Sequence, residues 1–244
     1  MRNIKITISY DGTGYSGWQF QTNGRSVQQE IEEAIGKVFR EKRRVMGASR
    51  TDAGVHAKAQ SANFKLLAPI PIDRIPAALN AALPASIAIV KAEKVSASFD
   101  AQHKASSKRY RYHVVNSIHK DPFSDRYAWR IPYPINVPVM RKEAKALVGR
   151  HDFKSFQASD TRERASVRTI HKLEVKKKGN TITFDIEANA YLYNMVRNIV
   201  GTLIDVGRGY LPAGSTEKIL ALKDRRKAGP TAPARGLFLI EVKY

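Results

Sequence analysis

The sequence predicts an α+β protein made of two ferredoxin-like or RRM-like α/β halves that share a largely antiparallel central sheet, with helices on one side. Three observations predict this class. Apolar residues alternate with polar ones along several segments, as in half-buried strands, and recur at helical spacing along others. The strands are also joined by hairpin-like connections as well as crossovers. We expect the halves to cover residues 1–104 and 105–244, with no flexible linker between them.

The N-terminal half contains four predicted strands and two predicted helices. Ile4, Ile6 and Ile8 alternate with polar residues, which indicates the first strand. Ser26 is followed by Gln29 three positions later, the pattern of a capping box at the start of a helix. The remaining predicted elements are a helix over 27–39, strands over 45–48 and 59–65, a short helix over 75–82 and a strand over 87–95.

The C-terminal half repeats this mixture. Two alternating segments, 167–175 and 182–188, are separated by Lys178-Gly179-Asn180, which predicts a hairpin. A long apolar stripe from Leu192 to Val206 predicts the longest helix, ended by a following glycine. The other predicted elements are a strand over 108–116, a helix over 140–148 and a final strand over 237–243.

The charge of the chain points to a polyanionic partner. Its 244 residues contain 42 Lys and Arg against 22 Asp and Glu, a formal net charge of +20. A surplus of this size makes the compact state repel itself, so folding does not require it. Nucleic acid is the leading partner, an anionic membrane surface is second, and a merely solvated basic surface is the third interpretation. The sequence has no signal-peptide pattern and no run as long as a membrane span, which favours a cytoplasmic protein without membrane partners.

Several kinds of chemistry lack their usual residues. The chain has no cysteine, so disulfides, thiolate metal sites and cysteine nucleophiles are excluded. The six histidines lack metal-ligand spacing, and the glycines from Gly12 to Gly17 complete no phosphate-binding or dinucleotide-binding motif. We therefore expect chemistry that uses no metal and no cofactor and is carried out by carboxylate, Arg and Tyr side chains.

The segment Gly47 to Ala57 is the first candidate site. Small residues surround Arg50, Asp52 and a histidine between two predicted strands. An ionised Asp52 could act as a nucleophile, and Arg50 could favour the ionised form by charge and hydrogen bonding. The alternative is an ordinary Asp-Ala-Gly turn with an incidental arginine, and the spacing alone favours this turn.

Two further segments combine basic residues with features of nucleic-acid binding. On a strand from Lys108 to His113, Tyr110 and Tyr112 face one way and the arginines the other. Aromatic rings stack on bases and guanidinium groups bind phosphates, although a core tyrosine beside solvated arginines fits the pattern equally well. The segment from Arg225 to Leu237 is basic and rich in Gly and Pro, as expected of either a disordered linker or an ordered loop entering a site.

Taken together, these segments resemble the tRNA pseudouridine synthase A family. The Asp52 segment is highly specific, and the others are strong in combination. The matching stretches, in family order, are Tyr10–Thr13 with Gly17–Gln19, Gly47–Ala57, Lys108–Tyr112, Val167–Ile170, Asn194–Gly201 and Ala228–Leu237.

The resemblance implies a reaction and a substrate. A uridine at position 38, 39 or 40 of the tRNA anticodon stem-loop is flipped out and rejoined to its ribose through C5 instead of N1. Asp52 matches the catalytic aspartate of the family, and attack on C1′, attack on C6 and promotion of glycosidic cleavage all remain open. The resemblance further implies that no cofactor is used and that the protein is a homodimer.

The resemblance also assigns roles around the substrate. Arg50 matches an arginine that helps to displace the target base, and Tyr110 matches a tyrosine that stacks on the uracil. Arg168 matches a basic residue that pairs with the aspartate, and Leu237 is the candidate for an apolar residue lining the pocket. The first half would then carry the catalytic loop, and the second half the stacking tyrosine and the basic RNA-binding segments.

Two positions depart from the family pattern, and two other functions remain open. Gln102 stands where an arginine is expected, which would weaken one phosphate contact to tRNA. Asn194 occupies a position that is histidine in some members. A non-catalytic RNA-binding module would explain the charge but not the Arg50–Asp52 loop. A hydrolytic nuclease would want a carboxylate cluster or a histidine pair, which the sequence does not offer.

Overall fold

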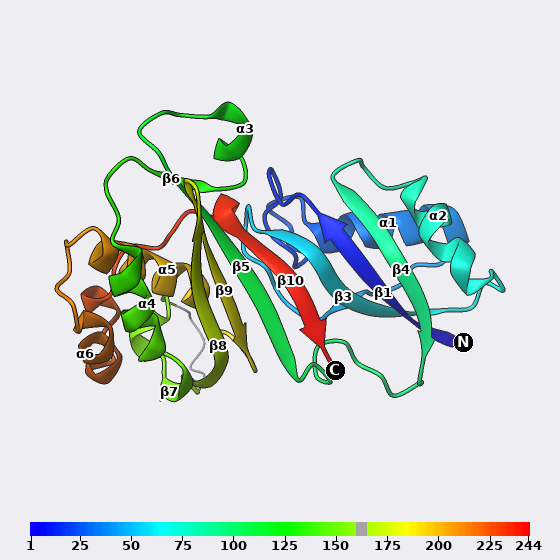
Figure 1. The fold of residues 1–244 in the computed structure, drawn as a ribbon. Coiled ribbons are helices and arrows are strands. Elements are labelled where there is room, and N and C mark those ends of the chain that lie inside the picture. The colour runs from blue at the N-terminus through cyan, green and yellow to red at the C-terminus, as the bar shows by residue number, and fades with distance from the viewer. Residues whose placement is uncertain (160–164) are drawn as a thin grey trace. The chain divides into compact units, whose positions relative to one another are not determined.

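The structure is a computed structural model that describes residues 1–159 and 165–244. The chain folds into two compact units (Figure 1). The first contains residues 1–106 and 238–244, and the second contains residues 107–237. The C-terminal segment thus belongs to the first unit, although the sequence places it in the segment 105–244. The reason is a parallel pairing of Phe238 with His56, a contact between distant parts of the chain that local patterns do not encode.

The first unit is built on a largely antiparallel sheet. Strand β1 (Arg2–Tyr10) is antiparallel to both β3 (His56–Leu66) and β4 (Ile87–Val95). The short strand β2 (Met46–Gly47) is antiparallel to one end of β3, and β10 (Leu237–Lys243) is parallel to the other end. The order β4-β1-β3-β2 is that of the predicted ferredoxin-like half.

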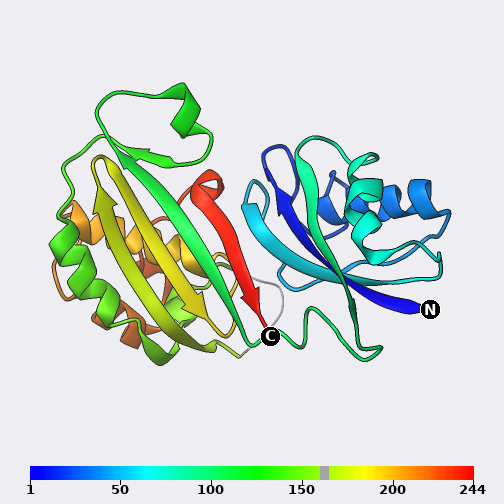
Figure 2. The same ribbon diagram turned by 45° about the vertical axis from the view of Figure 1, so that its right-hand side comes forward.

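Two helices cover one face of this sheet (Figures 1 and 2). Helix α1 (Val27–Phe39) begins as predicted, because the Ser26 hydroxyl accepts the backbone N–H of Gln29 at 3.3 Å. Helix α2 (Ile75–Asn80) follows a single turn of 3₁₀ helix, Ile72–Arg74. The alternating residues Ile4, Ile6 and Ile8 are fully buried, as expected of a strand with one face on the core.

The second unit contains its own antiparallel sheet. Strands β5 (Ser107–Asn116), β9 (Thr181–Ala188), β8 (Val167–Lys178) and β7 (Gly149–Asp152) are neighbours in that order. The predicted hairpin joins β8 to β9, and Gly179 has the positive φ of +56° that favours glycine in a tight turn. A short strand, β6 (Trp129–Ile131), pairs in parallel with the end of β5.

Helices α4 (Val137–Lys145), α5 (Met195–Gly207) and α6 (Ser215–Leu222) lie on one face of this second sheet (Figures 1 and 2). Nearly every side chain of α5 is buried, so it forms the centre of the core. A one-turn helix, α3 (Pro122–Asp125), lies between β5 and β6. Short 3₁₀ turns cover Lys154–Phe156, Arg225–Lys227 and Ala234–Gly236.

These elements confirm the predicted α+β class with a largely antiparallel sheet. The long periodic segments were predicted nearly to their ends, and β4 and β10 have the predicted bounds. Elements β6, β7, α3 and α6 were not predicted, because each is short or lacks a long apolar pattern.

Candidate active site

Asp52 lies at the start of a tight turn in the first unit. The backbone N–H of Val55 donates to the Asp52 carbonyl oxygen at 3.1 Å, which closes the turn. Gly54, the third residue of the turn, has a φ of +75°, as a type II turn requires. Asp52 itself is half-buried, while Thr51 before it and Val55 after the turn are both buried. The backbone around the carboxylate is therefore anchored on both sides.

Thr51 is held from two directions. Its hydroxyl shares a 2.7 Å hydrogen bond with the buried hydroxyl of Tyr10, at the end of β1. Its carbonyl oxygen accepts the backbone N–H of Trp18 at 3.0 Å. Burial raises the pKa of Tyr10, so this hydroxyl stays neutral and available for hydrogen bonding.

The glycine-rich loop after β1 packs directly on the Asp52 turn. A Cβ on Gly12 would lie 2.0 Å from the carbonyl oxygen of Val55, and one on Gly17 would lie 2.6 Å from that of Thr51. The backbone N–H of Gly54 also donates to the carbonyl oxygen of Tyr15 at 3.3 Å. The glycines thus allow two backbones to approach closely. The sequence showed only that these glycines complete no phosphate-binding motif, and it did not predict this packing role.

Residues before the turn are fixed by a tryptophan and a glutamine. A Cβ on Gly47 would lie 2.3 Å from the indole ring of Trp18, so only glycine fits beside this buried side chain. The fully buried Gln60 on β3 bonds to both backbone groups of Ser49. It accepts the N–H at 3.2 Å and donates to the carbonyl oxygen at 2.6 Å.

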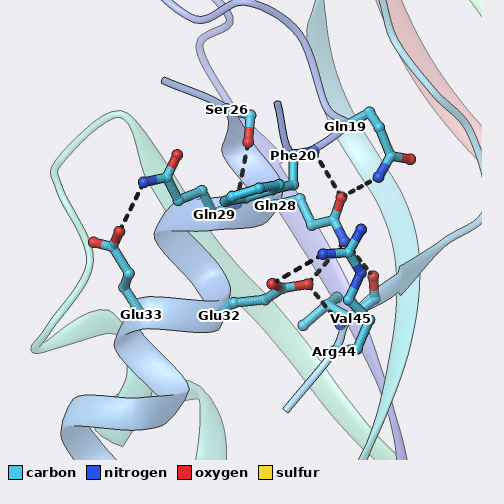
Figure 3. A network of polar contacts seen from close by, with 9 residues as sticks. All are labelled: Gln19, Phe20, Ser26, Gln28, Gln29, Glu32, Glu33, Arg44 and Val45. Atoms are coloured by element: carbon cyan, nitrogen blue, oxygen red, sulfur yellow. Dashed lines mark hydrogen bonds and ion pairs between the residues drawn. The ribbon is translucent and has the colours of Figure 1, made fainter. Parts of the chain in front are cut away.

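Figure 3 shows the polar network that attaches this segment to α1. The buried side chain of Gln28 accepts the backbone N–H of Phe20 at 2.8 Å. Its amide donates to the carbonyl oxygen of Val45 at 3.1 Å and to the Glu32 carboxylate at 2.8 Å. Glu32 in turn accepts the Val45 N–H at 3.0 Å and lies 3.6 Å from the Arg44 guanidinium. Helix α1 therefore fixes both the strand leading to Asp52 and the chain beyond Trp18.

His56 connects the end of the candidate segment to the glycine-rich loop. Its buried Nδ1 accepts the backbone N–H of Gly12 at 3.0 Å and lies 3.1 Å from the Asp11 carboxylate. Its ring stacks on Phe238 at a centroid distance of 4.6 Å. The sequence flagged this histidine only as part of the segment, because its partners come from other strands.

Arg50 is exposed on the same loop as Asp52. The structure thus places these two residues in one segment of the first unit, and it places Tyr110, Arg168 and Leu237 in the second unit. The expected influence of Arg50 on the ionisation of Asp52 stays a prediction.

Tyr110 lies on β5 with the predicted alternation around it. Tyr110 and Tyr112 are buried, whereas Arg109 and Arg111 point to the other side of the strand and are half-buried. The Tyr110 ring meets that of Tyr191 edge to face, with centroids 5.1 Å apart. The Tyr112 hydroxyl donates to the carbonyl oxygen of Pro233 at 2.6 Å, so this second tyrosine is a core residue.

The two arginines of β5 share one carboxylate. Arg111 lies 2.9 Å and Arg109 lies 3.9 Å from Asp185 on the neighbouring strand β9. Arg111 and Asp185 are direct cross-strand partners, and opposite charges at such positions stabilise the sheet.

The Arg168 side chain is held by backbone carbonyl oxygens, and the Leu237 side chain is buried. Arg168 is half-buried on β8, and its Nη1 donates to the carbonyl oxygens of Ala165 and Val167, each at 2.7 Å. Leu237 is buried and is the first residue of β10.

The basic segment before Leu237 is an ordered loop and not a disordered linker. Arg225 donates to the Asn198 side chain at 3.0 Å, to the Thr231 hydroxyl at 3.1 Å and to the Gly229 carbonyl oxygen at 2.9 Å. A Cβ on Gly201 would lie 1.7 Å from the Pro230 carbonyl oxygen, so α5 and the loop are in close contact.

The chain that carries this arrangement matches a known protein family. A family model described as tRNA pseudouridine synthase matches residues 6–104 and 144–244. The chain belongs to the tRNA pseudouridine synthase family. The resemblance predicted from the separate segments is therefore confirmed, and the matched ranges include the Asp52 loop, Arg168 and the final strand.

Relatives of full length have the same family name. A tRNA pseudouridine synthase A from Thermoanaerobacter sp. (strain X514) is 47% identical over 244 residues, which cover 100% of both chains. The protein of that name from Caldicellulosiruptor bescii is 42% identical over 100% of both chains. The one from Bacillus pumilus is 43% identical, over 99% of this chain and 98% of its own. A solved Cbf5-Nop10-Gar1 complex contains a chain 11% identical to this one, with a TM-score of 0.39 over 96% of this chain and 57% of that chain. A likeness this remote supports no inference.

This synthase is an isomerase that converts uridine in tRNA to pseudouridine. Within residues 1–159 and 165–244, no three His, Asp or Glu side chains are arranged to hold a metal ion. Within the same ranges, no helix is long and apolar enough to cross a membrane.

The two departures from the family pattern lie in well-defined places. Asn194 precedes α5 with a left-handed φ of 57°, a backbone region that asparagine tolerates better than most residues. Its side chain accepts a hydrogen bond from Arg197 at 2.8 Å. Gln102 is half-buried in the turn after Asp100 in the first unit, where its N–H donates to the Asp100 carboxylate at 2.8 Å.

Proposed function

We propose that this synthase modifies uridines at positions 38, 39 and 40 of the tRNA anticodon stem-loop, with Asp52 as the nucleophile. The observation that supports Asp52 most strongly is its anchoring. The carboxylate is half-buried on a turn whose neighbours are bonded to β1, to the glycine-rich loop and to β3. A preorganised nucleophile avoids the cost of ordering the chain during the reaction.

The reaction rearranges bonds within one nucleotide. The N1–C1′ bond breaks, a C5–C1′ bond forms, C5 loses its proton and N1 gains one, so no external reactant is needed. An ionised Asp52 could attack C1′ or C6, or it could stabilise the separated sugar. Each of these routes requires the carboxylate in its charged form, which is the role proposed for it.

The proposal includes a flipped-out uridine. A base stacked in a stem or loop is out of reach of a side-chain nucleophile, and flipping costs a few kcal/mol. We assign Tyr110 to stack on the flipped uracil, which would return about 1–3 kcal/mol. Arg50 would help to displace the base, Arg168 would pair with Asp52, and Leu237 would line the base pocket.

Tritium release tests the nucleophile. Wild-type protein should release tritium from tRNA that carries [5-³H]uridine. Asp52→Asn should bind the same tRNA and release none. Asp73→Asn, which changes an exposed aspartate of the first unit, is the matched control and should retain full activity. Full turnover by Asp52→Asn would refute the assignment.

The modified positions need a separate experiment. Pseudouridine mapping on tRNAs that carry a single uridine at position 38, 39 or 40 should show a product at each one. A product confined to the D or T arm would refute the anticodon stem-loop as the substrate region. The homodimer and the cytoplasmic location implied by the family resemblance are likewise proposals, and sedimentation of the purified protein tests the first of them.

A further inference from the structure

Residues 117–128, here called the α3 arm, extend away from the sheet of the second unit (Figures 1 and 2). The arm leaves the end of β5 and returns through β6, which pairs in parallel with the same strand. The arm lies in the gap between the matched family ranges, residues 6–104 and 144–244, and so does Tyr110. No role in the reaction accounts for this segment.

The backbone of the arm is held in place. The Asp121 carboxylate caps α3 by accepting the N–H groups of Phe123 at 3.1 Å and Ser124 at 3.2 Å. Arg130 donates to the Ile118 carbonyl oxygen at 3.1 Å, and Arg235 donates to that of Ala128 at 3.2 Å. The conformation of the arm is therefore supported from both of its ends and from the basic loop.

Large apolar side chains point outward from this supported backbone. Phe123 is 88% exposed, the highest value for any large hydrophobic residue in the described ranges, and Ile118 is 77% exposed. Tyr127 is 40% exposed. Exposed apolar residues gathered on a fixed segment are typical of a binding surface.

The charges on and beside the arm favour an anionic partner, because four cations meet two carboxylates there. The cations are Lys120, Arg126, Arg130 and Arg235, and the carboxylates are Asp121 and Asp125. Lys120 and Arg126 lie in the arm, and the Arg126 guanidinium lies 5.7 Å from the centre of the Tyr127 ring. Asp121 already caps α3. Asp125 lies 3.8 Å from Lys120 and 3.7 Å from Arg235, so its charge is compensated by both. Phosphates of RNA would complement Lys120 and Arg126, whereas the same arm of a second copy would place like charges against them.

We propose that the α3 arm binds unpaired nucleotides of the tRNA substrate, with Phe123 stacking on a base and Lys120 and Arg126 meeting phosphates. Aromatic stacking accepts any base, and the neighbouring cations follow the backbone. The arm thus adds a second contact to the tRNA, made by a segment that takes no part in the chemistry. The proposal rests on tRNA as the substrate and not on the position modified or on Asp52.

Substitutions of Phe123 test the stacking contact. Phe123→Ala should weaken tRNA binding at least about fivefold and raise KM more than it lowers kcat. Phe123→Trp keeps an aromatic face and should restore binding. Because Phe123 is 88% exposed, its variants should fold as the wild type does, which thermal unfolding checks. Leu222→Ala, which removes a 57% exposed apolar side chain from α6, is the matched control and should leave KM unchanged.

The salt dependence of tRNA binding tests the role of Arg126, and sedimentation tests whether the arm binds a second copy of the chain instead. Arg126→Ala should lower the slope of log Kd against log salt concentration by about 0.7–0.9, whereas Phe123→Ala should leave that slope unchanged. Unchanged tRNA affinity in Phe123→Ala would overturn the proposal. Loss of self-association by Phe123→Ala in sedimentation would overturn it too, because the arm would then be a contact between copies of the chain.

Discussion

Gly14 and Gly17, both in the glycine-rich loop, allow backbone strain to be distinguished from steric contact with the Asp52 turn. Both have left-handed backbone, with φ values of +80° and +96°. A Cβ on Gly14 would meet nothing within 4 Å, whereas one on Gly17 would lie 2.6 Å from the Thr51 carbonyl oxygen. Any other residue would be strained at both positions, but only a side chain at position 17 would press on the turn that carries Asp52.

We therefore expect Gly17→Ala to lower kcat by at least tenfold. Both Gly17→Ala and Gly14→Ala should lose about 1–2 kcal/mol of stability from left-handed strain. Only Gly17→Ala should also displace Thr51 and misplace the neighbouring carboxylate, since small displacements at a reacting group are costly. Urea unfolding and tritium release at saturating tRNA measure the two effects. Equal kcat values for the two variants would show that the contact with Thr51 does not position Asp52.

At the scale of single residues, the sequence predicted which residues belong to the candidate site better than it predicted what they contact. Residue types and spacing indicated the Asp52 segment, and the family resemblance supplied its importance. The packing of Gly12 and Gly17 on that segment depends on two loops that meet only in the folded chain. The same is true of His56, whose partners Asp11 and Phe238 come from other parts of the first unit.

At the scale of elements, α1 supports the candidate site through Gln28. Its buried amide links Phe20, Val45 and Glu32, whereas the side chain of the next residue, Gln29, donates to Glu33 along the helix surface. We expect Gln28→Ala to lose about 2–4 kcal/mol of stability, because several buried polar groups lose a partner. The matched variant Gln29→Ala should stay within about 0.5 kcal/mol of the wild type. Chemical unfolding compares them, and similar losses in both would contradict a supporting role for the network in Figure 3.

Helix α6 depends on a carboxylate from α4. Glu143 accepts the backbone N–H groups of Gly214 at 2.6 Å and Thr216 at 2.9 Å, at an N-terminus that has no side-chain cap of its own. Burial acts to raise the pKa of Glu143, but these donors outweigh it and hold the pKa below its ordinary value of 4.5. The stabilising contribution is therefore present above pH 4.5 and is lost as the pH falls through the lowered pKa.

Glu143→Gln should consequently destabilise the protein at pH 7 by about 1–3 kcal/mol. The difference from wild type should shrink as the pH falls below 4.5, because the wild-type carboxylate becomes protonated and loses its charge. Glu217→Gln, at an exposed position in the first turn of α6, is the matched control. Thermal unfolding at pH 7 and near pH 3.5 measures both variants, and a pH-independent difference would refute the role of the charge.

The same contact explains why α6 was not predicted. The N-cap position of α6 is Gly214, which has no side chain that could cap the helix. Glu143 takes this role instead, and it lies 71 residues away in sequence. Helix α3 is a single turn, too short for a periodic pattern. Strand β7, Gly-Arg-His-Asp, has no apolar residue. Long periodic elements could be predicted because each carries its own signal, whereas these short ones depend on neighbours.

For the whole molecule, charge is the property that the sequence predicted best. Many carboxylates lie beside cations in the folded chain, as Asp185 lies beside Arg109 and Arg111 on the second sheet. Such pairs remove charges in equal numbers, so the surplus of 20 positive charges is unaffected by them. Folding gains nothing from this surplus, and an RNA substrate accounts for it.

Binding of tRNA should therefore weaken steeply with salt. Each phosphate neutralised by Lys or Arg releases condensed counterions, and six to ten such contacts would reduce the affinity about 10³- to 10⁵-fold between 50 and 200 mM salt. Filter binding of full-length tRNA across this range gives the slope, and Asp52→Asn should show a nearly parallel line because Asp52 neutralises no phosphate. If the slope for wild type were close to zero, the positive charge would not contact the tRNA backbone, and the surplus would need another explanation.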